Sequence, residues 1–149
     1  MKNLEIEKVL NLLVEKLHEI NYAFIGSVNL YIQGLEVNPR DIDILTTPED
    51  QKIIDNILEK YQIKEIIFDK TNNRNSFRSF YKINEIEIEV LGNVNNKYRK
   101  LDSLDSKIYV RFNGIKFPCI SLVEEINTYK QMGREDKIRM IQEFLKTQK

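Results

Sequence analysis

Cysteine, histidine and tryptophan are nearly missing from this sequence. Its 149 residues include one cysteine, one histidine and no tryptophan. A single cysteine excludes an internal disulfide and most zinc frameworks. That residue, Cys119, lies in the apolar run Phe117-Pro118-Cys119-Ile120, where a buried and unreactive thiol is expected.

Long apolar runs are missing as well. None approaches the roughly 18 residues that a membrane-spanning helix needs, so no membrane-embedded segment is predicted. The chain begins with an amphipathic, charge-rich pattern instead of the apolar core of a signal peptide. We therefore expect a cytoplasmic protein.

The chain also lacks an excess of charge of either sign. Lysine and arginine together number 23, and aspartate and glutamate also number 23. Dedicated nucleic-acid binders usually carry a basic excess or a dense basic cluster. The densest basic stretches here, 97–100 and 137–139, are short and interrupted. Nucleic acid would therefore be bound only through a local patch.

What is present is the composition of a globular protein. Hydrophobic residues make up 42% of the chain and charged residues 31%, which favours a packed core over disorder. The length is that of one ordinary domain, and we find no internal repeat or linker. The sequence predicts one α/β domain over residues 1–149.

Hydrophobic periodicity predicts a mixture of helices and strands. Apolar residues recur at helical spacing in the first segment and at every second position near Asp41. Asn84 and Asn113-Gly114 favour tight hairpins, and Thr47 and Ser121 favour helix starts. The predicted helices are 3–20, 28–33, 48–60, 122–132 and 136–145, the predicted strands are 22–25, 41–45, 63–68, 77–83, 85–91, 108–112 and 115–119, and the Asn-rich segment 71–76 is a predicted connection.

Asp41 and Asp43 are the first candidate site residues. Alternation along a strand places both carboxylates on one face, with Cα atoms about 6.5–7 Å apart. Aspartate is depleted in strands, and two carboxylates this close repel each other unless a cation lies between them. Oxygen ligands of this kind suit Mg²⁺ or Mn²⁺. The alternative is a solvated strand face without a ligand.

Gly26 and Ser27 supply a second candidate feature. They end a short apolar strand and begin a helix. Glycine lets the backbone approach a phosphate closely, and the amides at a helix start attract anions. Alone, this pair would be an ordinary strand-to-helix turn. Together with the downstream acids it predicts a site for a nucleoside triphosphate and its metal.

These residues form a pattern that resembles a known family. The hydrophobic strand, the glycine–serine pair, the short helix and the acidic strand occur in that order as Phe24-Ile25-Gly26-Ser27, Leu30, Gly34 and Arg40-Asp41-Ile42-Asp43-Ile44. The pattern is similar to the signature of the DNA polymerase β-like nucleotidyltransferase superfamily. Segment 129–137 is similar to a segment in small prokaryotic members. The resemblance implies a nucleotidyltransferase fold, with a mixed central sheet flanked by helices.

The resemblance also implies roles for individual residues. Asp41 and Asp43 would bind metal, and Gly26 and Ser27 would hold the triphosphate. The family's third acid matches Glu89 best, with Glu87 as the rival, and it would bind metal or act as general base. The alternative for both glutamates is an exposed strand face, where alternating glutamate is normal.

Two basic residues are weaker candidates for binding the nucleotide. Arg40 could contact a phosphate, or it could pair with an acid such as Glu36. Lys130 could reach the triphosphate as a point charge, or it could be an ordinary surface lysine. Arg74 and Arg78 border the Asn-rich segment and could face an acceptor.

The resulting hypothesis is Mg²⁺-dependent transfer of a nucleoside monophosphate from a nucleoside triphosphate, such as ATP, to a hydroxyl. The acceptor, whether small molecule, protein or RNA, is not readable from the sequence. A second hypothesis is a non-catalytic nucleotide- or partner-binding module on the same fold, such as an antitoxin-like partner of a helical toxin. A protein partner or homo-oligomer is compatible with either.

Overall fold

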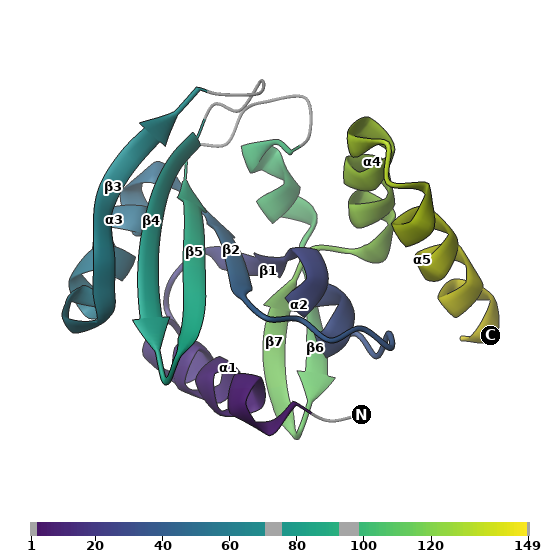
Figure 1. The fold of residues 1–149 in the computed structure, drawn as a ribbon, viewed down its shortest axis with the longest axis horizontal. Helices are drawn as coiled ribbons and strands as arrows, with labels where there is room; N and C mark the ends of the chain where they lie inside the picture. The colour runs from purple at the N-terminus through teal and green to yellow at the C-terminus, as the bar shows by residue number, and fades with distance from the viewer. Residues whose placement is uncertain (1–2, 71–75, 93–98, 149) are drawn as a thin grey trace.

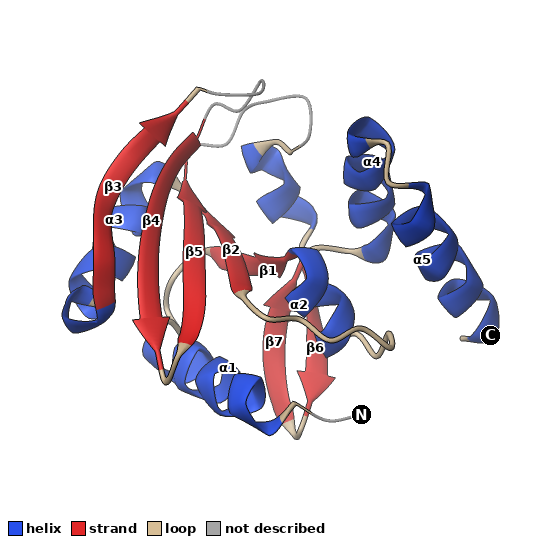
Figure 2. Ribbon diagram, in the orientation of Figure 1, coloured by secondary structure: helices blue, strands red, loops and turns tan. Residues whose placement is uncertain are grey.

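The computed structural model of the chain describes residues 3–70, 76–92 and 99–148 (Figures 1 and 2). Most of the predicted 71–76 connection therefore lies outside the described residues. The α-helices are α1 (Leu4–Lys16), α2 (Gly26–Ile32), α3 (Pro48–Ile57), α4 (Leu122–Met132) and α5 (Glu135–Thr147), with 3₁₀ turns η1 (Glu59–Tyr61) and η3 (Leu101–Ser106). The strands are β1 (Tyr22–Ile25), β2 (Ile42–Thr46), β3 (Gln62–Asp69), β4 (Ser76–Ile83), β5 (Ile86–Gly92), β6 (Ile108–Phe112) and β7 (Ile115–Cys119).

The strands of the described residues form one seven-stranded sheet in the order β3-β4-β5-β2-β1-β7-β6. The pairs β2–β5 and β1–β7 are parallel, and the other neighbours are antiparallel. The predicted fold class, a mixed central sheet flanked by helices, is confirmed. Because β1 and β2 lie at the centre, the sheet itself places the predicted motifs side by side (Figure 2).

The main core lies on one face of this sheet. Ile42 and Ile44 of β2 are fully buried there and belong to the same apolar cluster as the inward residues of α1 and α3. A smaller cluster on the other face includes Leu45 of β2 and Leu104 of η3. Alternation along β2 therefore anchors its even-numbered residues in the main core, which leaves Asp43 on the opposite face.

Local sequence signals account for most turns and helix starts. Asn84 and Glu85 have φ of 49° and 68°, and Asn113 and Gly114 have φ of 52° and 78°, as tight hairpins between twisted strands require. Thr47 and Ser121 accept hydrogen bonds from the amides three residues on, at 3.0 Å and 3.2 Å. These predictions are confirmed.

Besides shifts of one to three residues at the ends of other elements, the structure differs from the predicted elements in two places. The first helix ends at Lys16 and not near residue 20, although Leu17 is fully buried and Ile20 packs against the main core. The helical spacing of apolar residues thus continues beyond Lys16, although the helix itself ends there. The second difference is η3, which lies in a segment too polar and irregular to show periodicity.

Cys119 has the predicted surroundings. It is fully buried in the main core, and burial raises the pKa of its thiol to about 12. In the described part of the chain, no helix has the length and apolar character needed to cross a membrane.

Candidate nucleotide and metal site

Asp43 is the centre of the candidate site. It lies in β2, with Ile25 of β1 opposite on one side and Glu89 of β5 opposite on the other. Neighbouring strands are about 4.8 Å apart, so the backbone alone brings the Asp43 and Glu89 carboxylates onto one face as close neighbours. Glu87 is exposed, and its register partner on β4 is Lys82.

The electrostatic surroundings of Asp43 are unfavourable to its negative charge. The pKa of Asp43 is raised to about 7, first by burial, then by the charge of Glu89 and then by that of Asp41. Arg99 acts in the opposite direction but more weakly. Asp41 itself is exposed and lies just before β2. A half-buried acid whose pKa is raised this far by burial and like charges is a common signature of a functional site.

The backbone of Gly26 lies close to Asp43. It begins α2 with φ of +72°, a conformation that glycine adopts without strain. A Cβ atom at this position would lie 3.2 Å from Asp43 Oδ2. Ser27, the next residue, is half-buried. The predicted motifs Gly26-Ser27 and Asp43 are therefore brought together, as the sequence hypothesis requires.

Glu125 of α4 is a part of this region that the sequence analysis missed. It is fully buried, and its Oε2 accepts from the Gly26 amide at 2.7 Å and from the Asn29 side-chain amide at 2.9 Å. Its Oε1 pairs with Arg99 Nη2 at 2.5 Å. The available signal was its spacing, because Glu125 occupies an inward position on the helix face of Leu122 and Tyr129.

Glu89 also has a basic partner. Arg78 of β4 donates from Nε to Glu89, and its Nη1 is 2.7 Å from Asp69 Oδ2. Both bonds lie on the sheet face that carries Asp43. Arg78 pairs with Leu91 in the β4–β5 register, and Leu91 lies two residues from Glu89, on the same face of β5. The pairing of Arg78 with Glu89 was not predicted from the sequence.

Arg40 and Lys130 lie at the margins of the region. Arg40 is exposed and directly precedes Asp41. Lys130 is exposed on α4 and does not line the pocket described next. Their assignment to nucleotide binding stays a prediction.

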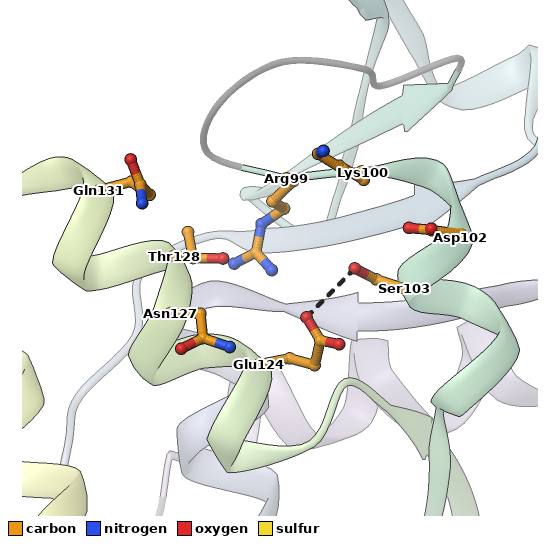
Figure 3. Close-up of a pocket in the computed structure, with 8 residues that line it drawn as sticks. All are labelled: Arg99, Lys100, Asp102, Ser103, Glu124, Asn127, Thr128 and Gln131. Carbon is orange, nitrogen blue, oxygen red and sulfur yellow. Dashed lines mark hydrogen bonds between the residues drawn. The ribbon is translucent and has the colours of Figure 1, made fainter.

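A polar pocket of about 270 Å³ lies between η3 and α4 (Figure 3). Arg99 enters it between the two elements and connects it to Glu125, and through Glu125 to Gly26. Ser103 Oγ donates a hydrogen bond of 3.4 Å to Glu124 Oε2 between the two elements. Among the described residues, the side chains that line it are all polar or charged: Arg99, Lys100, Asp102, Ser103, Glu124, Asn127, Thr128 and Gln131.

The acids around Asp43 are candidate ligands for a divalent cation. Within the described residues, no three His, Cys, Asp or Glu side chains are gathered closely enough to hold a metal as they stand. Asp41 and Asp43 nevertheless offer the hard oxygen donors that Mg²⁺ prefers, and Mg²⁺ commonly uses only one or two carboxylates with water and phosphate oxygens. The mutual repulsion at Asp43 is what a cation would relieve. The acid pair therefore fits such an ion.

The chain is similar in structure to known proteins. A crystal structure of a "putative nucleotidyltransferase" from Thermotoga maritima is similar to this chain, with a TM-score of 0.83 and 26% sequence identity. The likeness covers 99% of this chain and 97% of that one. No protein-family model matches the sequence, and the search of curated proteins gives no match. The fold is thus nucleotidyltransferase-like, and the likeness supports that general class of protein.

Proposed function

We propose that this protein is a metal-dependent nucleotidyltransferase that transfers a nucleoside monophosphate from a nucleoside triphosphate to a hydroxyl and releases pyrophosphate. The observation that carries the proposal is Asp43, a half-buried acid whose pKa is raised to about 7 beside Asp41, Glu89 and the backbone of Gly26. The general class agrees with the likeness to the Thermotoga maritima structure.

In this proposal Asp41 and Asp43 hold Mg²⁺ or Mn²⁺. When bound, the cation would neutralise phosphate charge and the repulsion between the acids. Gly26 leaves room for a phosphate beside β2, because it has no side chain to fill the space next to Asp43. The Ser27 hydroxyl would donate a hydrogen bond to the triphosphate.

Glu89 is the proposed third acid. Its position opposite Asp43 would let it accept the proton of the attacking hydroxyl, as a carboxylate general base does. The pocket between η3 and α4 is the proposed place for the nucleoside or the acceptor. Asn127 and Gln131 both line it and can each donate and accept hydrogen bonds.

The test is equilibrium binding of labelled ATP, CTP, GTP and UTP to the purified chain, with Mn²⁺ and with EDTA. We expect binding of at least one nucleotide that requires the metal, and a loss of about 100-fold or more in Asp41→Asn and Asp43→Asn, since each removes a metal ligand. The matched control is Glu87→Gln, which removes an exposed acid from the same sheet face. Unchanged nucleotide affinity in both aspartate variants would refute the assignment.

A second candidate function is a module that binds a nucleotide but does not transfer any part of it. Two hydrogen bonds favour this candidate. The Gly26 amide is already bonded to Glu125, and Glu89 is already bonded to Arg78. Such a protein would bind the nucleotide but leave it intact. Incubation with α-³²P-labelled nucleotides and a lysate fraction separates the two candidates: a labelled acceptor and released pyrophosphate support transfer, and intact bound nucleotide supports the module.

A further inference from the structure

Arg78 is held on three sides. It bonds Glu89 of β5 through Nε and Asp69 of β3 through Nη1, the latter at 2.7 Å. Its Cζ atom lies 5.0 Å from the centre of the Phe80 ring, which is a favourable cation–π arrangement. The Arg78 side chain is only 20% exposed. Its position is therefore fixed by packing as well as by charge.

Glu89 is the partner that connects Arg78 to the candidate site. Its side chain is 24% exposed, and the residue lies opposite Asp43 in the β2–β5 register. Arg78 approaches from β4, the strand on the other side of β5. A charge-assisted bond in this setting holds the Glu89 carboxylate on Arg78.

We infer that Arg78 is a latch on Glu89. While the pair is closed, the cation site of the proposed function consists of Asp41 and Asp43, and Glu89 joins as a third carboxylate only when the pair opens. The inference rests on the proposed function, because it requires Asp41 and Asp43 to bind a divalent cation. It also accounts for why, among the described residues, Asp41, Asp43 and Glu89 do not gather into a three-acid cluster.

The chain offers a matched control for the charge of Arg78. Lys82 lies four residues later on β4, so it projects from the same sheet face. It is exposed and stands opposite Glu87, not Glu89. Lys82→Gln therefore removes one positive charge from the same strand and face without releasing Glu89.

The experiment is Mn²⁺ titration of the full chain without nucleotide, with free Mn²⁺ followed by electron paramagnetic resonance. We expect Arg78→Gln to bind Mn²⁺ about tenfold more tightly than the wild type, since metal affinity rises with the number of carboxylate ligands. Lys82→Gln should stay within about threefold of the wild type, because it does not change the two-carboxylate site. Arg78→Gln should cause no tightening when combined with Glu89→Gln.

The double variant separates the latch from a general charge effect. If Arg78→Gln tightens Mn²⁺ binding equally with and without Glu89, the effect is long-range electrostatics and the latch is refuted. Unchanged or weaker binding in Arg78→Gln also refutes it. If Arg78→Gln fails to fold, Arg78→Lys replaces it. Lysine lacks the planar fork with which Arg78 bonds Glu89 through Nε and Asp69 through Nη1. Partial tightening is therefore expected, and unchanged affinity overturns the inference.

The proposed function can fail separately from the latch. Mn²⁺ binding by the wild type that is lost in Asp43→Asn supports the proposed function, whatever the Arg78 variants do. A wild type that binds no Mn²⁺ refutes both proposals.

Discussion

Glu125 and Asp43 both lie against Gly26, yet the protein surrounds these two acids in opposite ways. Glu125 is fully buried and is satisfied by the Gly26 amide, the Asn29 side chain and Arg99. Asp43 is half-buried, and its nearest charges are mainly other acids, so its pKa is raised to about 7. A buried acid with a full set of donors supports a fold, whereas a buried acid among acids is prepared for a cation or a proton.

The contacts of Glu125 also explain how Gly26 comes to lie beside Asp43. Glu125 ties α4 to the first residue of α2 through a single hydrogen bond of 2.7 Å. That bond holds Gly26 where its Cα can face Asp43. Glu125 therefore positions the Gly26 backbone next to Asp43. Variants of these residues separate the structural role of Glu125 from the role proposed for Asp43.

Loss of the structural acid should have the largest effect on stability. Glu125→Ala removes a charged partner of Arg99, a side chain that is only 9% exposed, and takes away the acceptor of the Gly26 amide. We expect a loss of about 3–5 kcal/mol in the free energy of unfolding, measured by urea denaturation. Glu124→Ala, at the neighbouring position, is the control and should cost less than about 1 kcal/mol. Equal losses in the two variants would contradict the structural role of Glu125.

Replacement of Gly26 should have the next largest effect. Gly26→Ala combines a left-handed backbone with a Cβ atom 3.2 Å from Asp43 Oδ2, whereas Gly114→Ala has a similar φ of +78° and nothing within 4 Å. Backbone strain should cost each variant about 1 kcal/mol. We expect Gly26→Ala to cost roughly 1 kcal/mol more, by urea denaturation. If Gly114→Ala is equally destabilising, the close approach to Asp43 has no energetic consequence.

Replacement of Asp43 should change the stability in the opposite direction and in a pH-dependent way. Its pKa is about 7 in the folded chain and 3.8 as an ordinary aspartate, so folding binds a proton between these values. Its contribution to stability is therefore present below pH 4 and is lost as pH rises through 7. In the absence of metal, Asp43→Asn should gain about 2 kcal/mol relative to wild type between pH 4 and pH 8, after discounting for solvent screening. Thermal melts across this pH range provide the measurement. If the stability of the two proteins changes with pH in the same way, Asp43 does not have the raised pKa.

Much of the fold could be predicted because its signals are local. Alternation identified β2 and β5, and Asn113-Gly114 identified the hairpin between β6 and β7. The first helix was predicted too long, because the apolar period continues through the turn at Leu17. The 3₁₀ turn η3 has no periodic pattern from which to predict it.

The candidate site was predictable only where the motif is contiguous in sequence. Gly26 and Asp43 belong to one short motif, and the structure brings them together. Glu125 lies 99 residues from Gly26 along the chain, and the Arg78–Glu89 pair depends on the register of β4 and β5. Pairings of this kind are set by strand order and helix packing, which a single sequence does not specify.

The most direct test of the central claim is a crystal structure of the protein with Mn²⁺ and a non-hydrolysable nucleoside triphosphate. The anomalous signal of manganese locates the ion independently of the protein atoms. We predict a manganese peak bound by Asp41 and Asp43, with the triphosphate beside Gly26 and Ser27. A well-bound nucleotide with manganese away from both aspartates would contradict the account.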